Sequence, residues 1–240
     1  MKVQIKYLTL TLTTICFTLL STAQEFRFGF KTSPAISWVK SNSKSLSADG
    51  AGIGFSYGLM GDFGLSDNYA FSTEILVTDM RSKFKMNDTI LTNNLAPGVS
   101  NYSDVSLDYK TKYLQIPISL KMKTGAVGSS GVVYYGQFGI APSFLISSKV
   151  KVTSSPGYVE GDFYSNNNTE NDGLGFNEFN DNVNFVRIPM ILGAGVEYPL
   201  SGNTSLVLGI RFDNSFIDML DDKKREAINN YLGLNIGVFF

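Results

Sequence analysis

The chain contains no histidine and only one cysteine, Cys16. Without histidine there is no Ser-His-Asp triad, no Asp-His hydrolytic pair and no histidine metal site, so we expect no catalytic residue, metal or cofactor. Cys16 lies in an apolar N-terminal stretch, which leaves the rest of the chain without a thiol for a disulfide or a nucleophile. The sequence therefore predicts a protein that is not an enzyme.

Excess charge and long apolar runs are also missing. The chain has 20 Lys and Arg against 21 Asp and Glu, a net charge of −1. No basic stripe stands out, so we expect no nucleic-acid partner. After residue 23, no segment approaches the roughly 20 consecutive apolar residues that a transmembrane helix needs. Any insertion into a membrane would therefore have to use strands.

The N-terminus predicts a signal peptide over residues 1–23. Two lysines precede an apolar and threonine-rich stretch at 7–20, and small residues at 21–23 suit cleavage. The alternative is a membrane-anchoring helix, but the stretch is too short and is interrupted by several threonines. We therefore expect export with cleavage, followed by one domain over residues 24–240.

Alternation of apolar and polar residues is what the chain has in abundance. The many Gly, Phe and Tyr residues suit strands, tight turns and interface girdles. The last segment shows the pattern well, because Leu234, Ile236, Val238 and Phe240 fall on one face. Period-two alternation predicts eight strands: Phe26–Trp38, Ile53–Phe63, Tyr69–Asp79, Leu107–Met122, Val132–Ile146, Asn184–Tyr198, Ser205–Asp213 and Tyr231–Phe240.

The links between these segments alternate in length. Short links at 64–68, 123–131 and 199–204 alternate with long ones at 39–52, 80–106, 147–183 and 214–230. This asymmetry is typical of outer-membrane barrels, in which tight turns lie in the periplasm and long loops point outward. We therefore predict an all-β fold, an eight-stranded antiparallel up-and-down transmembrane β-barrel with short periplasmic turns and four long outward loops.

The same alternation would also fit a soluble lipocalin-like barrel whose apolar face points inward. An eight-stranded barrel is only just wide enough for side chains to fill it, so the bulky apolar set should face outward into lipid. Trp38, Tyr69, Tyr198 and Tyr231 would then suit the interface girdles. Inside, charged side chains would form a structural polar network, without a transport or catalytic role: Arg27, Glu74, Lys121, Arg187, Glu197, Arg211 and Asp213.

Several motifs carry a family resemblance: QEFRFGFKTSP after the signal, YLQIPISLKMK at 113–123, YYGQFGIAPSF in the fifth predicted strand, GAGVEY at 193–198 and YLGLNIGVFF at the end. With these, the chain resembles the PorT-type outer-membrane β-barrel family of Bacteroidetes. The resemblance implies a porin-like barrel in the bacterial outer membrane, inserted by the barrel-assembly machinery, with Phe240 as the assembly signal. It brings no shared catalytic residues.

Three functions fit these expectations. The first is a structural anchor or loop-mediated binding protein with a filled lumen, in contact with outer-membrane lipid and with envelope proteins. The second is a narrow channel or transporter for small solutes, although eight strands leave little lumen. The third is an accessory subunit of a protein secretion or gliding apparatus, as a few members of the resembled family are. The sequence specifies neither a ligand nor an oligomeric state.

Overall fold

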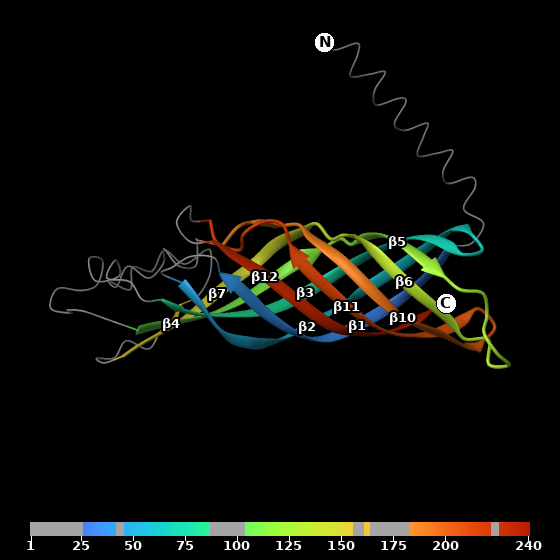
Figure 1. Ribbon diagram of the computed structural model, residues 1–240, viewed down its shortest axis with the longest axis horizontal. Helices are drawn as coiled ribbons and strands as arrows, with labels where there is room; N and C mark the ends of the chain where they lie inside the picture. The colour runs from blue at the N-terminus through green and yellow to red at the C-terminus, as the bar shows by residue number, and fades with distance from the viewer. Residues whose placement is uncertain (1–25, 42–45, 87–103, 156–160, 164–182, 222–225) are drawn as a thin grey trace, which may run out of the picture.

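The computed structural model describes residues 26–41, 46–86, 104–155, 161–163, 183–221 and 226–240 (Figure 1). The predicted signal peptide at 1–23 lies outside these residues, as do parts of all four long links. Within the described ranges, no helix combines the length and the apolarity needed to cross a bilayer.

The described residues form twelve β-strands that belong to one antiparallel sheet. Their bounds are β1 Phe26–Ser41, β2 Leu46–Ser66, β3 Tyr69–Met86, β4 Asp104–Gln115, β5 Ile118–Lys123, β6 Val133–Ile140, β7 Ser143–Ser155, β8 Gly161–Phe163, β9 Val186–Arg187, β10 Pro189–Ser201, β11 Thr204–Ser215 and β12 Ala227–Phe239. Because β1 pairs with both β2 and β12, and β2 also pairs with β3, the sheet closes on itself.

Eight wall strands make up the ring, because the short β8 only pairs along β7 and three of the wall strands are each interrupted once. β4 continues as β5, β6 as β7 and β9 as β10, with breaks next to Pro117, Pro142 and Pro189. Proline has no N–H to donate to a ladder. The carbonyl groups of the prolines still accept hydrogen bonds. The Ile116 N–H donates to the Pro142 carbonyl over 2.8 Å, so the wall continues across the break. The fold class predicted from the alternation is confirmed.

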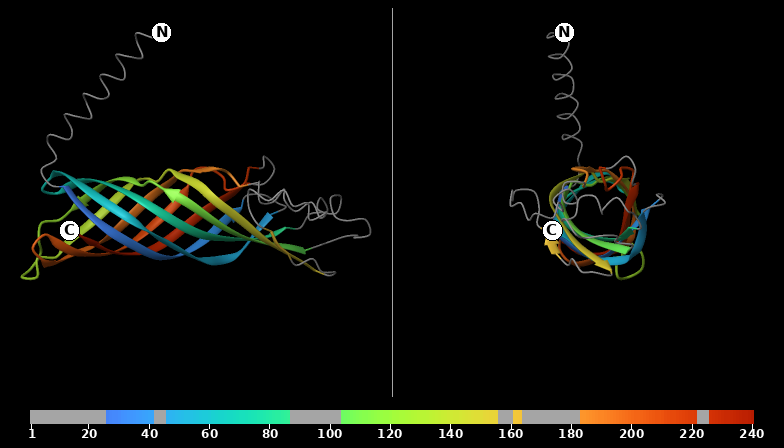
Figure 2. Two further views of the ribbon diagram at one scale, coloured as in Figure 1. Left: turned by 180° about the vertical axis from the view of Figure 1, so that it is seen from behind. Right: turned by 90° about the vertical axis from the view of Figure 1, so that its left-hand side faces the viewer.

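The two ends of the barrel differ (Figures 1 and 2). At one end, here the turn end, lie the tight hairpins at Ser66–Tyr69 and Ser201–Thr204, the link from β5 to β6 and the C-terminus. Gly202 takes a φ of 55° in its two-residue turn, a conformation that favours glycine. At the opposite end, the loop end, β2, β3 and β7 extend well beyond the strand ends predicted from alternation.

Side chains alternate between the two faces of the wall as predicted. Phe26, Phe28 and Phe30 of β1 are exposed outside, whereas Lys31 and Ser33 are buried inside. Glycines make room in the lumen: a Cβ at Gly195 or Gly209 would collide with the Tyr135 hydroxyl. The bulky apolar rows thus face away from the barrel axis, and the lipocalin-like alternative is wrong.

The interior departs from the prediction at the loop end. Between the charged residues and the loop end, the lumen is packed with inward-facing apolar side chains. All of them are nearly inaccessible to solvent: Leu46, Phe84, Leu107, Tyr109 and Val150. Phe84 and Tyr109 make an edge-to-face contact with ring centroids 5.8 Å apart. The prediction that Tyr231 belongs to an outer girdle is also wrong. This residue is 3% exposed and lies inside the barrel.

Candidate functional site

The predicted charged residues all project into the lumen, because each occupies an inward position of its strand. Arg27 comes from β1, Glu74 from β3, Lys121 from β5 and Arg187 from β9, and the remaining three come from β10 and β11. Six of the seven are buried, whereas the side chain of Arg27 keeps 20% of its surface accessible. The structure sorts them into two ion-pair clusters and one separate arginine.

The first ionic cluster lies toward the turn end and consists of Arg27, Asp62, Lys121 and Glu197. An Nη2 to Oε2 distance of 2.8 Å joins Arg27 to Glu197, and Lys121 Nζ donates to Asp62 Oδ2 over 2.8 Å. The crossed pairs, Arg27 with Asp62 and Lys121 with Glu197, also lie within ion-pair distance. Two cations therefore meet two carboxylates, and the cluster is formally neutral.

Aromatic rings close this cluster on its other side. The Arg27 guanidinium lies 4.7 Å and the Lys121 ammonium 4.8 Å from the centroid of the Phe239 ring, and Lys121 also lies 4.5 Å from that of Tyr135. Met60 and Val207 pack with these rings. Cation–π contacts of this kind gain strength where water is excluded, so charges and rings together fill the lumen near the turn end.

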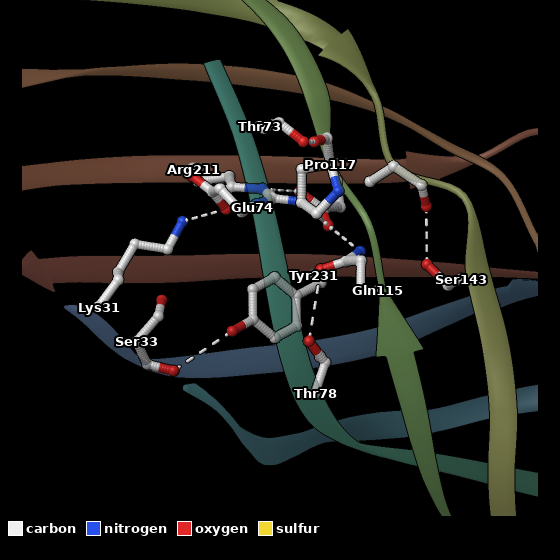
Figure 3. A network of polar contacts seen from close by, with 12 residues as sticks. Lys31, Ser33, Thr73, Glu74, Thr78, Gln115, Pro117, Ser143, Arg211 and Tyr231 are labelled. Carbon is white, nitrogen blue, oxygen red and sulfur yellow. Dashed lines mark hydrogen bonds and ion pairs between the residues drawn. The ribbon is translucent and has the colours of Figure 1, made fainter. Parts of the chain in front are cut away.

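The second ionic cluster consists of Lys31, Glu74, Arg211 and Asp213, and Figure 3 labels the first three. Lys31 Nζ donates to Glu74 Oε2 over 2.6 Å, and Arg211 Nη1 donates to the same oxygen over 3.0 Å. Arg211 also holds Asp213 with two hydrogen bonds, of 2.7 and 3.1 Å. Gln115 donates to Asp213 over 3.1 Å. This cluster too is neutral, and every charged member is buried.

A tyrosine layer lies beyond the second cluster. The Tyr231 hydroxyl donates to the Ser33 carbonyl over 3.3 Å (Figure 3). Its ring belongs to a buried apolar cluster with Ala35, Met80 and Tyr113. Tyr231 therefore carries its hydroxyl into the polar layer and its ring into the apolar packing toward the loop end.

Arg187 stands apart from both clusters. It is 4% exposed, donates one long hydrogen bond of 3.4 Å to the Asn229 carbonyl, and its Nε has no hydrogen-bond partner. It pairs with no carboxylate among the described residues. In the pairing of β10 with β11, Ile191 and not Arg187 lies opposite Asp213. The structure thus leaves this arginine out of the ion pairs that were expected for it.

Lys31 and Asp62 are missing from the predicted network although alternation places both on the inner face. Asp62 lies directly opposite Arg27 in the pairing of β1 with β2. That register would have identified it as a partner, because opposite charges are favoured at facing positions. Lys31 lies between Gly58 and Gly237 on the neighbouring strands. These glycines leave Lys31 room to reach Glu74. Only the strand register shows that both neighbours of Lys31 are glycines.

The remaining predicted residues lie on the outer face of the wall. Trp38 stacks on Phe212 with ring centroids 6.1 Å apart, and Tyr69 and Tyr198 are about half exposed. Phe240 follows β12, donates its N–H to the Phe28 carbonyl over 2.8 Å and turns an exposed ring outward. The apolar band is thus continuous across the seam between β1 and β12.

Comparison with known proteins identifies a matching family model and several solved structures that are similar to this chain. The model of a family described as "outer membrane protein beta-barrel domain" matches residues 22–221. No curated protein matches the chain. Among solved structures, Neisserial surface protein A is 15% identical with a TM-score of 0.42, covering 90% of this chain and 97% of that one.

Two further structures are similar at the same level. Ail of Yersinia pestis, solved in complex with the heparin analogue sucrose octasulfate, is 14% identical with a TM-score of 0.39, covering 90% of this chain and 100% of that one. OprG from Pseudomonas aeruginosa is 11% identical with a TM-score of 0.39, covering 89% and 92%. At these identities the likeness concerns the fold alone.

Proposed function

The chain belongs to the outer membrane protein beta-barrel domain family, and from this premise we propose that it is a filled barrel that anchors its outward loops in the bacterial outer membrane. The barrel is a structural anchor or a loop-mediated binding protein, and it carries no catalysis. Its partners are the outer-membrane lipid and envelope proteins that the loops contact.

The filling of the lumen is the observation that supports this proposal. From the turn end to the loop end, the interior holds an aromatic and ionic layer, a second ionic layer, a tyrosine layer and an apolar layer. Each cation of the two clusters pairs with at least one carboxylate of its own cluster. A passing solute would have to separate buried pairs, and leaving one buried charge without its partner costs about 3–5 kcal/mol.

Conductance across planar bilayers tests the proposal. The purified full-length protein is expected to show no large, steady conductance, because buried ion pairs and apolar side chains of the described residues occupy the lumen. A stable, reproducible channel from the wild-type protein would overturn the filled anchor.

A narrow channel is the second candidate, and Arg187 is the observation that favours it. A buried cation without a carboxylate partner among the described residues is a feature that attracts anions. In a channel, Arg187→Gln and Glu197→Gln should change conductance or ion selectivity. In a filled anchor they change only the free energy of unfolding, and the exposed Lys40→Gln serves as the charge-matched control for Arg187→Gln.

Further parts of the proposal concern biogenesis and context. We propose that residues 1–23 direct export and are removed, and that the barrel-assembly machinery recognises Phe240 during insertion. Within the family, we propose a PorT-type barrel from Bacteroidetes. An accessory role in secretion or gliding would appear as co-purification with large membrane partners and loss of secreted cargo on deletion of the gene.

A further inference from the structure

The ion pairs of the lumen do not balance the charge of Arg187. Each ionic cluster contains two cations and two carboxylates, so neither has a carboxylate to spare for this arginine. Among the described carboxylates, Asp213 acts most strongly on Arg187, yet it already accepts two hydrogen bonds from Arg211 and one from Gln115. A buried cation without a partner is costly, so a ligand with negative charge would stabilise the fold at this place.

The guanidinium of Arg187 also has donors left over. Its Nη2 donates one long hydrogen bond of 3.4 Å to the Asn229 carbonyl, and its Nε is buried without a hydrogen-bond partner among the described residues. A guanidinium presents five N–H donors in a planar fork and cannot accept a hydrogen bond. The group that satisfies Nε must therefore be an acceptor, and anions are the strongest acceptors.

Two hydroxyl groups without partners belong to the same part of the lumen. Asn229 Nδ2 donates to Ser82 Oγ over 2.9 Å. Ser82 is directly opposite Tyr109 on β4, which makes Thr111 its diagonal neighbour. Thr111 is in turn directly opposite Ser148 on β7. The hydroxyls of Thr111 and Ser148 are both buried and have no hydrogen-bond partner of good geometry within the described part of the chain. The contacts thus lead from the guanidinium to two hydroxyls that are able to donate.

Packed layers enclose this polar site on both sides. On the turn-end side lies Tyr113 of the tyrosine layer, which acts electrostatically on Arg187 and lies beside Thr111. On the loop-end side lie Phe84 and Tyr109 of the apolar layer, whose rings are in contact. Electrostatic attraction is stronger where packed side chains exclude water, and a site between packed layers favours a small ligand.

We propose that Arg187 binds a small monovalent inorganic anion, chloride in size, inside the barrel, and that the hydroxyls of Thr111 and Ser148 donate to it. The unpartnered Asn229 Oδ1 is an acceptor, and these donors outnumber it. A small inorganic anion is favoured over an organic acid or a phosphate because packed layers enclose the site. The inference goes beyond the filled anchor and does not depend on it, since the same donors would hold a resident or a passing anion.

The stability of the full-length protein in two salts tests the proposal. The protein is refolded in detergent micelles with sodium chloride or with sodium gluconate at the same ionic strength, since gluconate is too large for the site. Urea unfolding then gives the midpoint in each salt. We expect a higher midpoint in chloride for the wild type, because a ligand that binds only the folded state stabilises it. Equal wild-type midpoints in the two salts would overturn the proposal.

Three variants show whether the site carries this effect. Arg187→Met should lose the dependence on chloride, and in gluconate it should be at least as stable as the wild type, because an unbalanced buried charge is gone. Thr111→Val should need about tenfold more chloride for the same gain, since one hydrogen bond to a charged group is lost. Lys40→Met, at an exposed position, should respond to chloride like the wild type. A chloride dependence that persists in Arg187→Met, or a loss of stability of this variant in gluconate, would contradict the proposal.

Crystals of the full-length protein grown with bromide in place of chloride locate the anion directly. We expect an anomalous bromide peak in contact with the Arg187 guanidinium, and its absence from the wild-type lumen would overturn the proposal. Bilayer conductance, which tests the filled lumen, is independent of both measurements. A conducting wild-type protein would remove the filled anchor, whereas the difference between the chloride and gluconate midpoints would still decide whether Arg187 binds an anion.

Discussion

Glu74 is the residue on which the second ionic cluster depends most. It accepts hydrogen bonds from Lys31 over 2.6 Å and from Arg211 over 3.0 Å, and all three residues are buried. Glu74→Gln keeps the size of the side chain but leaves two buried cations with one carboxylate, Asp213. Breaking a buried pair in this way costs about 3–5 kcal/mol. We expect a loss of that size in the free energy of unfolding.

The double variant Lys31→Met/Glu74→Gln separates charge balance from other effects. It removes one charge of each sign and leaves Arg211 paired with Asp213, so the cluster is neutral again. We expect the double variant to be more stable than Glu74→Gln alone, with a coupling free energy of about 1–3 kcal/mol. Lys40→Met, at an exposed position of the same strand as Lys31, controls for the loss of a lysine.

Urea-induced unfolding from lipid vesicles, followed by tryptophan fluorescence and by the mobility of the folded band in gels, measures these differences. The reasoning would be refuted by a Glu74→Gln variant within about 1 kcal/mol of the wild type, the range of exposed ion pairs. It would equally be refuted if adding Lys31→Met destabilised the Glu74→Gln protein further. Either result would mean that water screens the cluster.

Three other changes test the packing of the barrel. Gly209→Ala should destabilise by about 1–3 kcal/mol through the clash with the Tyr135 hydroxyl, and Tyr135→Phe should restore part of that loss in the double variant. Phe30→Lys places a charge in the outer apolar band and should cost about 2–4 kcal/mol in vesicles, a loss that would be absent if this face were not in lipid. Tyr231→Phe removes the hydrogen bond to the Ser33 carbonyl and should cost about 1 kcal/mol in urea unfolding; an unchanged protein would contradict that bond.

The wall of the barrel could be predicted from the sequence because apolar and polar residues alternate with a period of two along each strand. Phe26, Phe28 and Phe30 alternate with Arg27, Gly29 and Lys31, and the structure exposes the first set and buries or half-buries the second. Strand ends were harder to predict. The loop ends of β3 and β7 carry arginine and lysines at outward positions, so their composition is typical of a loop although they are paired strands.

The pairing inside the barrel could not be predicted, because it depends on register. Alternation identifies inward charges, but only the pairing of β1 with β2 places Asp62 opposite Arg27. The apolar layer at the loop end does not follow from alternation alone, because Leu107 and Tyr109 alternate with charged outward residues beyond the outer apolar band, where the inner face is no longer polar. Aromatic residues near strand ends occupy both faces of the wall, so the position of Tyr231 near a strand end does not distinguish an outer girdle from the lumen.

The long-range ion pairs have a consequence for assembly. Arg27 and Glu197 are 170 positions apart, and Glu74 and Arg211 are 137 positions apart. These bonds form only when strands from both halves of the chain stand in one ring, so an unfinished barrel carries uncompensated charges toward lipid. Ring closure and ion pairing are therefore coupled, so these pairs stabilise only the complete barrel.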